Sequence, residues 1–267
     1  MIERNIFIKI AYDGSSYHGW QIQPNCNTIQ ETIQNSFLKI TGEKIKLNAS
    51  GRTDAGVHAK EQVATFKTSC SIPNNKIKDA LNGDLPEDIS IIASYGVGDL
   101  FHARYNAIGK TYFYRVYYGR ELNPFLRNYS WHYPYKFSKK ILDKSKDRLL
   151  GVHNFSAFQA SGSSVIDTVR EIYDIKIIDN EAEKFLDIYI TGNGFLYNMV
   201  RIIVGTLFEI ASGRMDDNII NRAFETCNRK ILGKTAPAKG LYLKKVYYNK
   251  NVLNKFIKNL DIAVKNG

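Results

Sequence analysis

Residues 49–59 read ASGRTDAGVHA, and the rest of the chain is arranged around this stretch. An alternating run at residues 44–48 precedes it, a second run at residues 62–66 follows it, and both predict strands. The stretch itself holds two glycines, an arginine, a carboxylate and a histidine, which makes it too polar for either strand. A charged loop held between two strands is a common place for a catalytic site, because the strands fix the geometry of its side chains.

The composition favours a globular protein with an anionic partner. The chain has 267 residues, of which 44% are hydrophobic, and this suits one large domain or two modest ones. A net charge of +11 indicates a nucleic acid, a membrane surface or simply high solubility. Aromatic residues make up 12% of the chain. Basic charge combined with aromatic rings favours RNA, since unpaired bases stack on such rings.

Several classes of site lack their sequence signatures. The three cysteines lie far apart and form no CxxC motif, which argues against a zinc ribbon and against a disulfide framework. The chain has no HExxH motif, EF-hand loop, Walker A lysine or dinucleotide fingerprint, so we expect neither a metal nor a cofactor. No signal peptide precedes the first predicted strand, and no apolar run approaches membrane-spanning length. We therefore expect a soluble, cytoplasmic protein that does not associate with a membrane.

The first half of the chain has the order strand, helix, strand, strand, helix, strand. Thr28 and Glu31 are spaced as a capping box at the start of the first helix, and Gly42 ends that helix. The order is that of the split βαβ units of ferredoxin-like domains. The remaining predicted elements of this half are strands at residues 5–12, 44–48, 62–66 and 89–97, and a helix at residues 74–81.

The second half repeats this theme, so we predict an α+β fold of two ferredoxin-like (RRM-like) halves. The halves are residues 1–105, with the charged loop, and residues 106–248, and a peripheral tail follows at residues 249–267. The predicted elements of the second half are strands at residues 110–118, 169–178, 185–191 and 241–248, and helices at residues 138–150, 195–207 and 216–227.

Arg201 lies in a predicted helix that is apolar on nearly every face, as a buried helix is. A buried guanidinium without a partner is costly, so Arg201 either reaches solvent or pairs with an acid. Asp54 is the natural candidate, with Arg52 as a second cation nearby. Two cations keep a carboxylate ionised, which suits a nucleophile or base. Alternatively, Asp54 merely forms a turn by bonding its own backbone.

Tyr112 and His58 each have a structural and a functional interpretation. Tyr112 shares one face of its predicted strand with Tyr114, where it either packs in the core or stacks on a base and receives a proton. His58 is either a general base or a structural residue. The structural alternative is the more common one for a single loop histidine, and the sequence places no second His or Asp to orient it.

Residues 51–58, GRTDAGVH, resemble the signature of the bacterial tRNA pseudouridine synthase A family. The resemblance covers nearly the whole chain and is weakest in the loop after Gln159 and in the C-terminal tail. Further blocks that match the family, in the same order, are YDG at 12–14, GWQ at 19–21, LN at 81–82, LP at 85–86, FHAR at 101–104, YFYR at 112–115, GFL at 194–196, MVR at 199–201, TAPA at 235–238 and GLY at 240–242.

The resemblance implies an isomerase that converts uridine to pseudouridine at nucleotides 38, 39 and 40 of the tRNA anticodon stem-loop. It also implies a homodimer, no cofactor, and two α/β halves whose antiparallel sheets join around a central active cleft.

In family terms Asp54 is the nucleophile, which attacks either the uracil ring or the ribose C1′. Tyr112 packs on the target base, and Arg201 pairs with the catalytic carboxylate. Arg52 helps to flip or replace the target nucleotide, and we group His58 with Arg52 and Tyr112 as substrate-binding residues.

Two other functions fit parts of the sequence. A non-catalytic RNA-binding protein would use the basic charge and the aromatic residues alone. A nucleoside glycosidase or small-molecule hydrolase would use Asp54, but the net charge speaks against it, because a small neutral substrate needs no basic surface.

Overall fold

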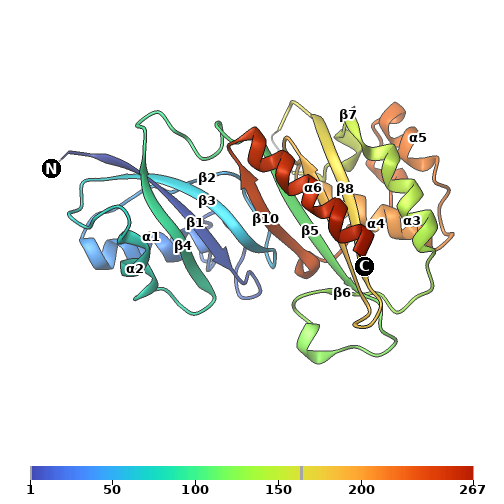
Figure 1. The fold of residues 1–267 in the computed structure, drawn as a ribbon, viewed down its shortest axis with the longest axis horizontal. Coiled ribbons are helices and arrows are strands. Elements are labelled where there is room, and N and C mark those ends of the chain that lie inside the picture. The colour runs from blue at the N-terminus through green and yellow to red at the C-terminus, as the bar shows by residue number, and fades with distance from the viewer. Residues whose placement is uncertain (1, 163–164, 267) are drawn as a thin grey trace. The chain divides into compact units, whose positions relative to one another are not determined.

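The computed structural model describes residues 2–162 and 165–266, which form two compact units of mixed α+β structure (Figure 1). The first unit contains the residues up to Ile108 together with Tyr242–Tyr248, and the second contains Gly109–Leu241 and the residues from Asn249 onward. The sequence predicts a boundary after residue 105 and a last strand that belongs to the second half. The structure instead groups residues of that strand with the first unit, where Tyr242 lies opposite His58 in a parallel pairing.

The first unit is built on a sheet with the strand order β4-β1-β3-β10. Strand β1 is antiparallel to both of its neighbours, β3 and β4. Helix α2 packs on β4 and touches α1. The elements are β1 (Arg4–Tyr12), α1 (Ile29–Thr41), β2 (Asn48–Ala49), β3 (His58–Thr68), α2 (Ile77–Asn82), β4 (Ile89–Val97) and β10 (Leu241–Tyr247).

The core of this unit forms where the apolar faces of α1 and the sheet meet. Phe37 of α1 meets Phe66 of β3 edge-on, with ring centroids 5.1 Å apart. Burial of such side chains is the main stabilising contribution. Fully buried residues of β1 and α1 have the spacing that predicted these elements, and they are Ile6, Ile8, Ile10, Ile29, Ile33 and Phe37.

Predictions for Thr28 and for residues 44–47 are wrong. Thr28 precedes α1, but its side chain makes no cap hydrogen bond, and its buried hydroxyl has no partner among the described residues. Residues 44–47 form no strand, and β2 is only Asn48–Ala49. The reason lies in α1: Gln34 accepts a hydrogen bond from the Leu47 amide at 3.0 Å, and Gln30 donates one to the Leu47 carbonyl at 3.1 Å. Side chains of a helix thus take the place of a neighbouring strand.

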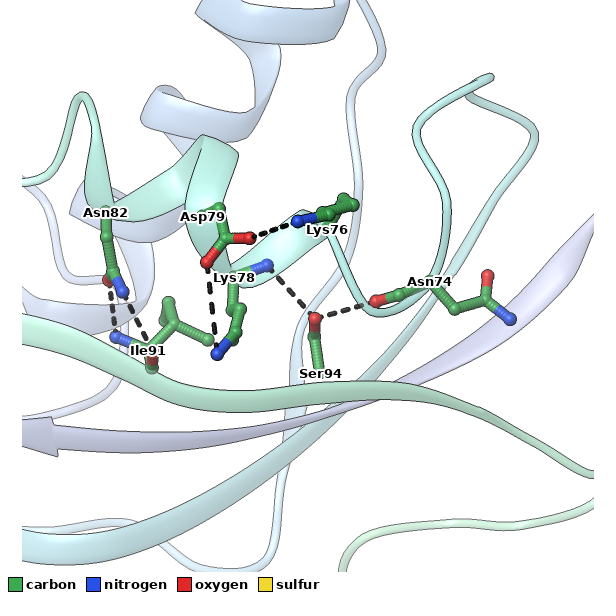
Figure 2. Close-up of polar contacts among 7 residues, drawn as sticks. All are labelled: Asn74, Lys76, Lys78, Asp79, Asn82, Ile91 and Ser94. Carbon is green, nitrogen blue, oxygen red and sulfur yellow. Dashed lines mark hydrogen bonds and ion pairs between the residues drawn. The ribbon is translucent and has the colours of Figure 1, made fainter.

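Hydrogen bonds to β4 fix the position of the short helix α2 (Figure 2). The Ser94 hydroxyl accepts from the Lys78 amide at 3.0 Å and donates to the Asn74 carbonyl at 2.7 Å. At the other end, the Asn82 carboxamide exchanges two hydrogen bonds with the backbone of Ile91, at 3.0 and 2.7 Å. Residue 74 therefore lies in the turn before α2, although we predicted that the helix begins there.

The second unit is built on a sheet with the strand order β5-β9-β8-β7, and β6 pairs with β5 in parallel. Neighbouring strands of the β5-β9-β8-β7 order are antiparallel. Helix α4 is buried on nearly every face, as its sequence predicted. The elements are β5 (Gly109–Tyr117), β6 (Trp131–His132), α3 (Lys139–Lys146), β7 (Gly151–Asn154), β8 (Val169–Asn180), β9 (Phe185–Gly192), α4 (Met199–Ala211), α5 (Ile219–Thr226), α6 (Lys250–Asn266) and the 3-10 turns η1 (Pro124–Leu126), η2 (Asp147–Leu149), η3 (Ser156–Phe158), η4 (Arg229–Ile231) and η5 (Ala238–Gly240).

Helices α4 and α6 differ from the sequence-based expectation. Asn198 adopts a left-handed conformation, with φ 61°, so α4 begins at Met199 and not at residue 195. We did not predict α6 from the sequence. It contacts β8 through an ion pair of 2.5 Å between Asp261 and Lys176, and it buries Leu253 and Leu260. In the described part of the chain, none of the helices combines the length and the hydropathy that a membrane crossing requires.

We expect Ser94→Ala to destabilise the first unit by about 1–3 kcal/mol, because the part-buried amide of Lys78 loses its acceptor and the Asn74 carbonyl loses its donor. Urea unfolding measures the change in the free energy of unfolding, and hydrogen exchange of the β4 amides shows whether the loss of stability lies at this strand. Lys76→Ala is the matched control, since it removes only an exposed ion pair with Asp79 at 3.4 Å, which is worth less than about 1 kcal/mol. Equal effects of the two substitutions would contradict this account of α2.

Candidate active site

The loop that carries Asp54 forms a tight turn between β2 and β3. The Val57 amide donates to the Asp54 carbonyl at 3.1 Å, and Gly56 has φ +75°. The main chain therefore closes this turn with its own hydrogen bond and a glycine of positive φ. The Asp54 side chain is half-buried, and Arg52 is exposed.

A second loop, residues 13–20, lies directly against the Asp54 loop. The Trp20 amide donates to the Thr53 carbonyl at 3.0 Å, and the Gly56 amide donates to the Tyr17 carbonyl at 3.3 Å. These bonds hold the two main chains side by side. The two loops are the GRTDAGVH block and the YDG and GWQ blocks of the sequence, so the structure explains why these blocks belong together.

Glycine is required where the two loops approach most closely. A Cβ at Gly14 would lie 2.1 Å from the Val57 carbonyl oxygen, and a Cβ at Gly19 would lie 2.6 Å from that of Thr53. Gly19 also has φ +89°, which disfavours any other residue.

His58 is the first residue of β3, and its side chain is only 2% exposed. Its ring stacks on Tyr242 at 4.6 Å between centroids. Nδ1 lies 3.1 Å from the Gly14 amide and 3.0 Å from Asp13 Oδ1. It can satisfy only one of these at a time, because the first requires a lone pair and the second an N–H. The structure thus places an Asp beside His58, which the sequence did not lead us to expect, and the burial favours the structural alternative.

Tyr112 lies on β5 opposite Ile190 and is 8% exposed. Its ring meets Phe195 edge-on at 5.2 Å. The opposite face of β5 carries Phe113, whose ring stacks on Tyr189 at 5.4 Å. The predicted alternation of β5 is therefore confirmed, and most of the Tyr112 ring is covered.

Arg201 is half-buried in α4, with its guanidinium held by two neutral acceptors. Nε donates to the Ala236 carbonyl at 2.7 Å, and Nη1 donates to Asn198 Oδ1 at 2.6 Å. Ala236 returns a hydrogen bond from its amide to the Arg201 carbonyl at 3.0 Å. These contacts meet the expectation that a buried guanidinium needs acceptors, and they fix its orientation.

Tyr114, one of the tyrosines that share the face of Tyr112, is tied to the same segment. Its hydroxyl donates to the Pro237 carbonyl at 2.7 Å. Burial raises the pKa of Tyr114 well above its usual value, and the charge of Arg201 opposes that rise. Gly240 is needed here, because a Cβ would lie 2.7 Å from the Tyr114 ring. The TAPA and GLY blocks of the sequence therefore hold Arg201 and Tyr114, a role that sequence reasoning missed.

The structure places the expected site residues in two groups. Arg52, Asp54 and His58 lie on one loop and the strand that follows it, in the first unit. Tyr112 and Arg201 lie on β5 and α4, which contact each other in the second unit. The pairing of Asp54 with Arg201 stays a prediction. Within residues 2–162 and 165–266, no group of three or more His, Cys, Asp or Glu side chains is arranged to hold a metal ion.

Comparisons with known proteins give consistent matches along the chain. A family model described as tRNA pseudouridine synthase matches residues 8–106 and 147–249. The chain is 46% identical to a tRNA pseudouridine synthase A of Thermoanaerobacter sp. (strain X514) over 245 residues, which are 92% of this chain and 100% of that protein. It is 45% identical to a tRNA pseudouridine synthase A of Acetivibrio thermocellus, with the same coverage of 92% and 100%.

A more distant relative in the same comparisons is a tRNA pseudouridine synthase A of Latilactobacillus sakei subsp. sakei, 43% identical over 90% of this chain and 97% of that protein. Among solved structures, a chain from "Crystal Structure of a Cbf5-Nop10-Gar1 Complex" matches with a TM-score of 0.33 and 13% identity, over 76% of this chain and 54% of that chain. A TM-score this low supports no conclusion about fold or function.

We expect Gly14→Ala to destabilise the first unit by about 1–3 kcal/mol or more, because the contact with Val57 involves main-chain atoms that no change of rotamer can move. Thermal unfolding of the purified variant measures the effect. Gly98→Ala is the matched control, since a Cβ at Gly98 meets nothing within 4 Å. A Gly14→Ala variant as stable as the control would show that the two loops do not need this close approach.

Proposed function

This chain belongs to the tRNA pseudouridine synthase family, and we propose that its Asp54 is the nucleophile that modifies nucleotides 38, 39 and 40 of the tRNA anticodon stem-loop. The protein is an isomerase that converts uridine in tRNA to pseudouridine. The observation that carries the proposal is the similarity along nearly the whole chain, Asp54 loop included. It argues against a non-catalytic RNA-binding protein and against a glycosidase.

The reaction rearranges one nucleotide and adds no atoms overall. The bond between N1 and the ribose C1′ breaks, the uracil rotates, and a bond between C5 and C1′ forms. The proton on C5 is lost, and N1 takes one up. A carboxylate suits this sequence because it attacks and later leaves. Both routes meet this balance. After attack at the ribose C1′, the bond to Asp54 breaks when C5 bonds to C1′. After attack at the uracil ring, it breaks by elimination once the base has rejoined the ribose.

Four other residues support Asp54 in this proposal. Tyr112 packs against the target base and relays the C5 proton: its hydroxyl oxygen takes up that proton while its own proton passes to solvent. Arg201 pairs with the Asp54 carboxylate, and the two neutral acceptors that orient its guanidinium support that role. Arg52 is exposed, as a residue that flips or replaces a nucleotide must be. His58 is buried, so its contribution to substrate binding is indirect, through the loop that it holds.

The finer architecture follows from the family resemblance. We propose that the two units correspond to two ferredoxin-like halves whose sheets join around the active cleft. The protein then acts as a homodimer in the cytoplasm, without a cofactor. The net charge of +11 supports a tRNA partner, because lysine and arginine neutralise phosphates. Sedimentation equilibrium of the purified protein tests the dimer, and a monomer at micromolar concentration would exclude it.

We expect Asp54→Asn to abolish the reaction and to leave tRNA binding nearly intact. The carboxamide keeps the shape of the side chain but is not a nucleophile. The measurement is release of tritium from tRNA labelled at uridine C5, with no added cofactor, together with the dissociation constant for the same tRNA. That constant should stay within about tenfold of the parent value, or about 1.4 kcal/mol.

Arg115→Lys is a control in this assay, because Arg115 forms an ion pair with Asp187 on the opposite face of β5. It should release tritium at the parent rate. Tritium release by Asp54→Asn would exclude Asp54 as the nucleophile.

Arg201→Lys should release tritium much more slowly than the parent protein and bind tRNA with the same affinity, since an ammonium cannot reproduce the fixed fork of the guanidinium.

A further inference from the structure

Tyr12 and Thr53 form a buried hydrogen bond beneath the Asp54 loop. The two hydroxyl oxygens lie 2.8 Å apart, and both side chains are almost fully buried. Thr53 immediately precedes Asp54. The contacts of its side chain and carbonyl therefore affect the direction in which the Asp54 side chain points. The carbonyl is held as well, by the Trp20 amide at 3.0 Å. Residue 53 is thus fixed through both its side chain and its main chain.

The start of the loop is also fixed from β3. Gln62 is fully buried, and its Nε2 donates to the Gly51 carbonyl at 3.0 Å. Its Oε1 accepts from the Ser50 hydroxyl at 2.7 Å. The loop is therefore attached to the sheet on both sides of Arg52, at Gly51 and at Thr53. Arg52 itself remains exposed.

Burial of this many polar groups is costly unless each has a partner. An apolar pair, such as Phe with Val, would fill the space under the loop at lower cost, but it would not fix the orientation of residue 53. Burial raises the pKa of Tyr12 to about 12, and its hydrogen bonds with Thr53 and Gln62 oppose the rise only in part. The Tyr12 hydroxyl is therefore protonated at neutral pH and serves as a neutral hydrogen-bonding group.

We propose that Tyr12 and Thr53 are positioning residues for the reaction: their hydroxyl pair holds the Asp54 carboxylate in the direction of attack without touching the substrate. This inference rests on the proposed role of Asp54 as the nucleophile. A misplacement of about 1 Å in a reacting group costs up to about a hundredfold in rate. Loss of the hydroxyl pair should therefore slow the chemical step and leave the affinity for tRNA almost unchanged.

The test is single-turnover tritium release by Tyr12→Phe, Thr53→Val and Thr53→Ser. We expect Tyr12→Phe and Thr53→Val each to lower the rate at saturating enzyme by about ten- to a hundredfold, with KM and the tRNA dissociation constant within about twofold. Thr53→Ser keeps a hydroxyl and should restore most of the rate. The double variant, Tyr12→Phe with Thr53→Val, should be no slower than the worse single variant, because each change alone already breaks the Tyr12–Thr53 bond.

Tyr248→Phe is the control for a merely structural effect. Its hydroxyl donates to the Ala103 carbonyl at 2.6 Å in the same unit, away from the Asp54 loop. It should reduce the unfolding temperature without changing the rate. Circular dichroism verifies that each variant is folded at the assay temperature, and a variant that is not folded there is assayed at a lower one.

The outcomes separate the two proposals. If Asp54→Asn is inactive and Tyr12→Phe or Thr53→Val reacts at the parent rate, the positioning role is wrong and the nucleophile stands. If both hydroxyl variants lose rate only in proportion to lost tRNA affinity, or if Thr53→Ser is as slow as Thr53→Val, the positioning role is also wrong. If Asp54→Asn remains active, the proposed function itself fails.

Discussion

The close approach of two loop backbones, residues 13–20 and residues 53–57, is the constraint on which the candidate site depends. Gly14 and Gly19 allow it, since a side chain at either position would overlap a carbonyl of the Asp54 loop. Three kinds of contact then build on this approach: the main-chain bonds of Trp20 and Gly56, the Tyr12–Thr53 pair, and His58 beside Gly14. A reactive carboxylate on a loop needs such support, because a loop without it would explore many orientations.

The second unit uses a comparable strategy for Arg201. Its guanidinium is oriented by Ala236 and Asn198, both neutral, so its positive charge is not cancelled by either of them. An arginine held in this way is suited to meet an anion, and in the proposed reaction that anion is the Asp54 carboxylate. Neutral groups thus orient the guanidinium of Arg201 and hold the main chain next to Asp54, at Thr53, and such fixed dipoles are what electrostatic preorganisation uses.

The sequence predicted those features that depend on local periodicity. Strand β4 has the predicted limits, Ile89–Val97, and α1 ends at Gly42 as expected. The start of α4 was missed for a local reason, the left-handed conformation of Asn198, but other failures depend on contacts between distant residues. The run at 44–48 alternates like a strand, but Gln30 and Gln34 satisfy the backbone of Leu47. The sequence also did not predict that Asp13 lies beside His58 or that glycines of one loop contact the other, because these contacts join residues far apart in the chain. The sequence blocks that contain these residues were nevertheless recognisable.

The most direct test of the central claim is a nucleotide-resolution map of pseudouridine in tRNA. The tRNA would come from a strain lacking this protein, complemented with either the parent chain or Asp54→Asn at equal abundance. We expect pseudouridine at nucleotides 38, 39 and 40 with the parent chain and unmodified uridine at all three with Asp54→Asn. Modification at these positions by Asp54→Asn, or no dependence on the parent chain, would contradict the central claim.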